Sequence, residues 1–232
     1  MKPAGRIGLL GGTLDPIHIG HVETARAARG ALDLEEVIVL PSRVPPHRQI
    51  QPIASGYHRF AMCALAVNGV EGLAASDLEL SAPGPSYTAD TLTRFQERSG
   101  VDRSQIFFIT GADAFADIAT WHRYPEVLDL ANFVVVSRPG FPAGRMRERL
   151  PALAARMTAA DCLKPSTTAG PGIFLVDAPT PDVSSTEVRR RLAAREALDG
   201  LVPAAVETHI HQHGLYAAAP GAPAANHLHG QN

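Results

Sequence analysis

Two histidines three residues apart follow a glycine pair in the run G-G-T-L-D-P-I-H-I-G-H, from Gly11 to His21. Apolar residues 6–10 precede this run and residues 20–31 have a helical pattern, so we expect a strand, a glycine turn and a helix start. Such a turn aims backbone N–H groups and the positive end of a helix dipole at one point, which suits a phosphate. His18 and His21 would add side-chain donors there. The run therefore indicates a protein that handles a nucleoside triphosphate.

The same two histidines allow two other interpretations. A helix would place them on one face, where they could bind a metal ion or be incidental surface residues. A zinc site needs a third ligand and usually a nearby general base, and H-E-x-x-H and H-x-x-E-H are absent. Other nucleotide loops fit less well, because G-x-x-x-x-G-K-[ST] is absent and the first turn lacks the G-x-G-x-x-G of dehydrogenases. The phosphate interpretation is preferred because it uses every part of the run.

The last third of the chain contains two further predicted helices. Residues 182–192, D-V-S-S-T-E-V-R-R-R-L, look like a helix start with a Ser or Thr cap and with Glu187 near the positive end of the dipole. Residues 203–213 begin with proline and are followed by glycine, which predicts a second helix. We expect both to form a small lid, as a C-terminal helical part at about 182–216. The Ala-, Pro-, Gly- and His-rich tail, 217–232, is expected to be disordered and non-catalytic.

The elements that must position these segments alternate between apolar runs and helical patterns. Strands are expected at residues 6–10, 36–40, 73–80, 105–110, 132–137 and 173–177. Helices are expected near residues 20–31, 56–68, 87–99, 113–130 and 144–159. This alternation predicts one α/β domain over 1–216, with a Rossmann-like, doubly wound parallel sheet and a small C-terminal helical subdomain. Ligands of such sheets lie beyond the carboxyl ends of the strands, where the glycine turn is expected.

Composition limits the class of protein. The chain has 232 residues, 45% of them hydrophobic, and a net charge of −2, so no global field attracts nucleic acid or an anionic membrane. Positive charge must then be concentrated at any anion site. Neither a signal segment nor a long apolar span is evident, so we expect a cytoplasmic protein with Cys63 and Cys162 reduced. We expect no nucleic-acid or membrane partner and leave a homo-oligomer open.

Six motifs in order resemble those of one enzyme family. The first run resembles the signature of the H-x-G-H nucleotidyltransferases, and V-S-S-T-E-V-R resembles their second signature, I-S-S-T-x-I-R. P-P-H-R, P-S-Y-T-A-D-T-L, G-A-D followed by a tryptophan, and S-R-P-G are similar to segments of the bacterial nicotinate mononucleotide adenylyltransferases. The resemblance extends from about residue 6 to 216. The chain departs from the family pattern at Leu14, Arg48, Val183 and Val188, and also at Arg43-Val44, where many relatives have a substrate-contacting asparagine.

The resemblance implies transfer of the adenylyl group of ATP to nicotinate mononucleotide, giving nicotinate adenine dinucleotide and pyrophosphate in NAD biosynthesis. It implies Mg²⁺ as a cofactor carried by the ATP phosphates, with no protein metal site. The catalytic residues would be His18, His21 and Arg189. ATP would be bound by Gly11, Gly12, Thr13, Asp15, Gly20, Ser184, Ser185 and Thr186. Nicotinate mononucleotide would be bound by Arg48, Tyr87, Thr88, Gly111, Asp113, Trp121 and Arg138.

Three alternatives remain open at this point. The chemistry could be the same with another acceptor, nicotinamide mononucleotide or phosphopantetheine, although the segments around Tyr87 and Trp121 argue against the latter. A non-catalytic nucleotide-binding protein could use the same fold, but His18, His21 and Arg189 argue against it because a binding module need not keep transition-state contacts. A dehydrogenase is the most distant alternative.

Overall fold

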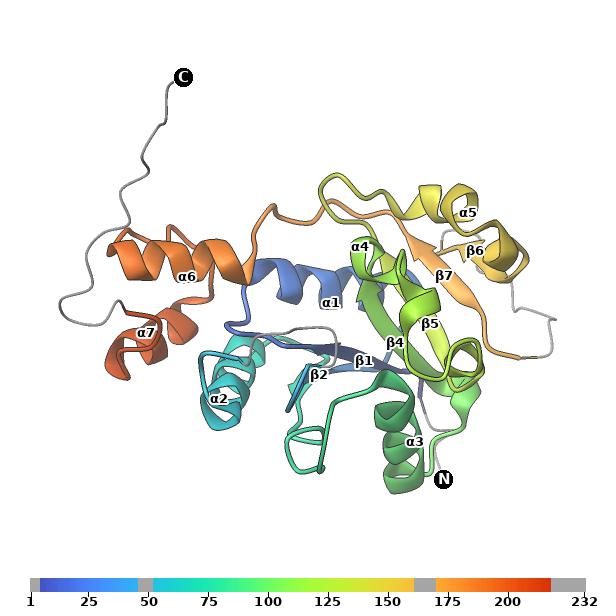
Figure 1. The fold of residues 1–232 in the computed structure, drawn as a ribbon, viewed down its shortest axis with the longest axis horizontal. Coiled ribbons are helices and arrows are strands. Elements are labelled where there is room, and N and C mark those ends of the chain that lie inside the picture. The colour runs from blue at the N-terminus through green and yellow to red at the C-terminus, as the bar shows by residue number, and fades with distance from the viewer. Residues whose placement is uncertain (1–4, 46–51, 161–169, 218–232) are drawn as a thin grey trace, which may run out of the picture.

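The chain folds around one seven-stranded parallel sheet in the order β3-β2-β1-β4-β5-β7-β6 (Figure 1). This is a computed structural model that describes residues 5–45, 52–160 and 170–217. The strands are β1 Ile7–Gly12, β2 Glu36–Pro41, β3 Leu73–Ala75, β4 Ile106–Gly111, β5 Asn132–Val136, β6 Met157–Ala159 and β7 Ile173–Val176. The helices are α1 Ile19–Leu32, α2 Gly56–Val67, α3 Thr88–Ser99, α4 Ala112–Phe115, α5 Met146–Arg149, α6 Ser185–Ala194 and α7 Ala204–Gln212. The predicted parallel α/β sheet is confirmed.

Each face of the sheet buries its own hydrophobic cluster, as the period of two along a strand requires. Leu10 faces one cluster and Leu9 the other, and Val134 and Val135 of β5 alternate in the same way. Both faces are therefore covered, which explains the continuous apolar runs of the central strands.

Two predicted helices are broken in the structure. The stretch 113–130 contains only α4 and two 3₁₀ turns, Ile118–Thr120 and Glu126–Asp129. The stretch 144–159 contains α5, a 3₁₀ helix Pro151–Arg156 and then strand β6, which the sequence analysis missed. Pro151 accounts for the second error, because a proline cannot continue a helix from the preceding turn, whereas α4 already ends at Phe115, before Pro125. Strand β3 is also shorter than predicted, since the chain turns after Ala75.

The two C-terminal helices belong to the main core. Val188 of α6 and Val206 and Ile210 of α7 are almost completely buried in the same cluster as Leu10 and Val134. Figure 1 shows α7 beside α2, with which it is in contact. The expected lid is thus a fixed part of the domain in this structure. The tail 218–232 lies outside the described residues. Among the helices that are described, none has the length and apolar character needed to cross a bilayer.

Candidate active site

The loop between β1 and α1 places both motif histidines at the carboxyl edge of the sheet. His18 is the N-cap of α1 and is 1% exposed, and its ring lies 3.7 Å from the ring of His21, centroid to centroid. The backbone N–H of His18 donates to Nδ1 of His21 at 3.2 Å. Because Nδ1 of His21 accepts this bond, the proton of the neutral ring is on Nε2.

The environment of His18 keeps its ring neutral. Burial, and secondly the positive charge of Arg138, lowers the pKa of His18 to about 3. Its Nδ1 is buried and has no hydrogen-bond partner among the described residues. Gly20 makes this position possible, because a Cβ there would lie 3.0 Å from Val183 and 3.1 Å from the His18 ring. The glycine of the H-x-G-H motif therefore has a packing reason that the sequence analysis did not give.

The start of helix α6 faces the same cavity from the far end of the chain. Ser184 is the N-cap and accepts from the backbone N–H of Glu187 at 3.1 Å, as the sequence predicted for this helix start. The Ser185 hydroxyl donates a hydrogen bond to the carbonyl of Pro16 at 2.9 Å. This bond fixes α6 to the loop between β1 and α1, residues 13–18, which we call the histidine loop. Two helix N-termini thus point at one space, and each contributes a partial positive charge there.

This space, the histidine pocket, has a volume of about 310 Å³. Its lining includes both histidines, Ser184, Ser185, Thr186, Gly111, Asp113 and Arg138. Gly111 ends β4, and a Cβ there would lie 2.4 Å from the carboxylate of Asp113 and 3.1 Å from the Arg138 side chain. The side chains of Asp113 and Arg138 can therefore approach this backbone closely. The pocket combines two helix starts, hydroxyls, two imidazoles and a guanidinium, a donor set suited to phosphate groups.

Two charged residues of the motifs hold the loop in place. The carboxylate of Asp15 is buried and accepts from the N–H groups of Ile53 and Ala54, at 2.8 and 3.1 Å, and from the hydroxyl of Tyr216, at 2.7 Å. The Asp15 carbonyl accepts from Arg189 at 2.6 Å. In the part of the chain described, Asp15 and Arg189 lie outside the lining of the histidine pocket and of the aromatic pocket described below. The structure therefore shows an internal role for the Asp15 carboxylate, and its contact with ATP stays a prediction.

Arg59 supports the same loop from helix α2. Its guanidinium is 2% exposed and donates to the carbonyls of Thr13 and Ser42, at 2.8 and 2.6 Å. The sequence analysis did not identify this residue, because an arginine in an amphipathic helix usually lies on its exposed face.

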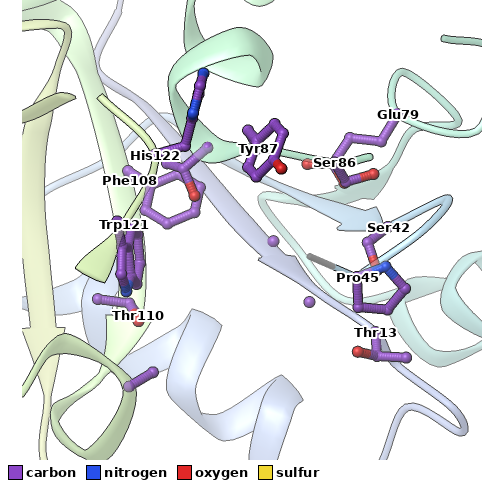
Figure 2. Close-up of a pocket in the computed structure, with 14 residues that line it drawn as sticks. Thr13, Ser42, Pro45, Glu79, Ser86, Tyr87, Phe108, Thr110, Trp121 and His122 are labelled. Carbon is purple, nitrogen blue, oxygen red and sulfur yellow. The ribbon is translucent and has the colours of Figure 1, made fainter. Parts of the chain in front are cut away.

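A second space, the aromatic pocket, adjoins the first and has a volume of about 270 Å³. Figure 2 shows Trp121, Phe108, Tyr87 and His122 on one side of it and Thr13 on the other. The Trp121 ring meets Phe108 edge-on, at 6.1 Å between centroids, and the Tyr87 and His122 rings stack at 4.3 Å. Tyr87 is the N-cap of α3 and Thr88 its first residue, so the first-turn N–H groups of this helix lie at the pocket.

The two pockets meet at Gly11, Thr110 and Ala114, which line both. The residues predicted for each substrate are distributed over both pockets. Gly12 and Thr13, assigned to ATP, line the aromatic pocket, whereas three residues assigned to the mononucleotide line the histidine pocket, namely Gly111, Asp113 and Arg138. Arg48 lies outside the described residues.

Several lining residues were missed from the sequence. They are Ser42, Pro45, Glu79, Ser86, Phe108, Thr110, Ala114 and His122 in the aromatic pocket, and Leu10, Thr24, Thr110 and Ala114 in the histidine pocket. Glu79 offered a signal, as an acidic residue within an apolar stretch. It accepts a hydrogen bond from Thr91 at 2.9 Å, and burial raises the pKa of its carboxyl group.

Comparisons with known proteins identify the family of the chain. Residues 9–191 match the cytidylyltransferase-like family. A probable nicotinate-nucleotide adenylyltransferase of Pseudomonas syringae pv. tomato is 40% identical, with 92% of this chain and 94% of that protein covered. One from Moorella thermoacetica is 37% identical, over 91% and 92%. The nicotinic acid mononucleotide adenylyltransferase of Plasmodium falciparum, solved with NaAD, shares the fold with a TM-score of 0.70 at 18% identity, over 92% and 98% of the chains.

Proposed function

The chain belongs to the nicotinate-nucleotide adenylyltransferases, within the cytidylyltransferase-like family, and on this premise we propose how its two adjoining pockets divide the reaction. The enzyme transfers the adenylyl group of ATP to nicotinate mononucleotide and releases pyrophosphate. An oxygen of the acceptor phosphate forms a bond to the α-phosphorus, and the bond from that phosphorus to the pyrophosphate oxygen breaks. The nucleophile is already an anion, so no general base is required.

The histidine pocket would hold the triphosphate. The donors proposed for it are the N–H groups at the start of α6, the His21 ring and the guanidinium of Arg138, with the positive end of the α1 dipole beside them. Fixed donors stabilise charge that grows on the departing pyrophosphate without reorganising during the reaction. His18, His21 and Arg189 are proposed as the catalytic residues. Arg189 would act from the rim, either by holding the Asp15 carbonyl or by turning toward the terminal phosphates.

The aromatic pocket would hold the mononucleotide. Trp121 and Phe108 provide an apolar surface for the pyridine ring, and the first turn of α3, at Thr88, can receive the nicotinate carboxylate. The negative charge of a carboxylate is attracted to the positive end of a helix dipole, and a neutral amide lacks this attraction. The α3 start would therefore favour the acid as acceptor. The observation that carries this assignment is the shared edge at Gly11, Thr110 and Ala114, where the two reacting phosphates would meet.

Mg²⁺ is proposed as the cofactor. The histidine pocket contains a single carboxylate in its lining, Asp113, so the ion would be held mainly by the ATP phosphates with Asp113 as its protein neighbour. When bound, the ion supplies positive charge that neutralises the phosphates.

The test is pyrophosphate release by purified protein with ATP and either nicotinate or nicotinamide mononucleotide. We expect release with both substrates present and a higher kcat/KM for the acid. Substituting Thr88 by proline removes the N–H of the first helical residue and should reduce the preference for the acid. The exposed Tyr57→Phe serves as the matched control. Absence of release with every mononucleotide would refute adenylyl transfer, and a preference for the amide would refute the assignment of the α3 start.

A further inference from the structure

Three histidines from two helices converge at a place that neither pocket uses. His58 is in the first turn of α2, His209 is in the last turn of α7, and His213 is the C-cap of α7. One ring nitrogen from each lies within 4.8 Å of the other two, and Nδ1 of His58 is 3.1 Å from Nε2 of His209. Among the described residues, this is the one cluster of three potential metal ligands.

The fold holds these side chains together for local reasons. His209 and His213 are four residues apart, so the α7 turn places them on one face. Val206 and Ile210, on the buried side of α7, fix that helix on the core beside α2. His58 is held by the cap of α2, since its backbone N–H donates to the hydroxyl of Ser55. The packing of α2 against α7 therefore brings the three rings together.

The geometry is close to that of a tetrahedral metal site. Zn–N bonds of about 2.0–2.1 Å place two imidazole nitrogens about 3.3 Å apart around the ion. The pair His58–His209 is already at 3.1 Å, and rotation of the exposed His213 ring would bring the third nitrogen closer. Three protein ligands leave the fourth position to water, on the exposed side of the cluster.

The spacing of the three rings disfavours their protonated forms. The rings lie with centroids 4.4 to 5.3 Å apart, so three imidazolium groups would repel one another. Neutral imidazole is the form that binds metal.

We propose that His58, His209 and His213 form a binding site for a first-row transition metal, with Zn²⁺ as the ion best suited to three imidazoles and a water. The site is separate from the adenylyl-transfer pockets and serves as a clamp between α2 and α7.

The clamp would act on the two supports of the histidine loop. Arg59, the residue after His58, holds the carbonyls of Thr13 and Ser42. Tyr216, three residues after His213, donates to the Asp15 carboxylate. Metal binding would therefore stabilise the folded state and join both supports, while the reaction itself requires no metal at this place.

The test uses the full-length chain without an affinity tag, treated with a chelator and then titrated with Zn²⁺. We expect a single Zn²⁺ per chain, and with Co²⁺ the visible absorption of a four-coordinate complex. At a free Zn²⁺ concentration 100 times the Kd, the melting temperature should rise by roughly 5–10 °C. His213→Ala and His58→Ala should each lower the Zn²⁺ affinity at least about 10-fold, because they leave two ligands.

Two matched controls keep the test specific. His211→Ala removes an exposed histidine of the same helix, which pairs with Glu207 and is outside the cluster. His227→Ala combined with His229→Ala removes the histidines of the tail. Both controls should bind Zn²⁺ like the wild type. The proposal is overturned if the wild type binds no Zn²⁺, if either control abolishes binding, or if both cluster variants bind normally. Pyrophosphate release by the Zn²⁺-free protein, assayed with ATP and Mg²⁺, separates this result from the proposed function.

Discussion

Tyr216→Phe isolates one buried hydrogen bond that connects the C-terminal segment to the histidine loop. The Tyr216 hydroxyl donates to Asp15 at 2.7 Å, and the residue is 8% exposed. A hydrogen bond to a charged group contributes about 1.5–3 kcal/mol net. The Asp15 carboxylate keeps its hydrogen bonds from Ile53 and Ala54 in the variant. The free energy of unfolding should therefore fall by an amount near the middle of that range, about 2 kcal/mol. For a chain of this size that corresponds to a melting temperature lower by about 4–8 °C.

Urea unfolding at fixed pH measures this loss directly, and thermal unfolding provides a second measure. Tyr57→Phe is the matched control because the Tyr57 side chain is 89% exposed, and its stability should change by less than about 0.5 kcal/mol. Tyr216 lines neither pocket, so turnover at a temperature where both variants are folded should stay close to the wild type. A free energy of unfolding within about 0.5 kcal/mol of the wild type would show that the Asp15 carboxylate does not depend on this donor.

The remaining predictions concern the pockets themselves. His18→Gln should reduce kcat about 100-fold, as loss of a fixed transition-state donor does, with little change in the acceptor KM; an unchanged kcat would remove His18 from catalysis. The pKa of His18 is about 3 in the fold, below its ordinary value of 6.5, so the unfolded chain binds the proton first and stability falls as pH drops from 6.5 toward 3. This group alone contributes a slope of about 1.4 kcal/mol per pH unit, which His18→Gln should remove in urea titrations at several pH values. Gly20→Ala places a methyl 3.0 Å from Val183 and against the His18 ring, and should lower kcat; a fully active variant would contradict the packing argument. Trp121→Ala should raise the acceptor KM about 10-fold and leave the ATP KM unchanged, and a change confined to ATP would reverse the pocket assignment.

The parallel sheet and the histidine loop were predictable because local patterns determine them. Continuous apolar runs mark strands that are covered on both faces, and a capped helix start is visible at Ser184 and Glu187. The break in the stretch 144–159 was not predicted, because the apolar spacing continues across Pro151 while the helix cannot. Strand β6 was missed for a related reason, since a three-residue strand leaves almost no period to detect.

The division of the site between two pockets could not be predicted from the order of the motifs. Arg138 and Asp113 belong to segments expected to bind the acceptor, yet they line the histidine pocket, because β4 lies next to β1 in the sheet and β5 lies next to β4. The buried supports were also invisible in the sequence. Arg59 and Tyr216 gain their roles only from the carbonyls and the carboxylate that the fold places beside them.

The protonation states of the two motif histidines determine where the positive charge of the site comes from. His18 is kept neutral by burial and by Arg138, and His21 is held as a donor at Nε2 by the bond that its Nδ1 accepts. Neither ring therefore needs to be an imidazolium for the site to work. The attraction for the triphosphate must come from Arg138, from the starts of α1 and α6, and from any cation that the substrate brings. A chain with a net charge of −2 can bind such an anion because these contributions are concentrated at one edge of the sheet.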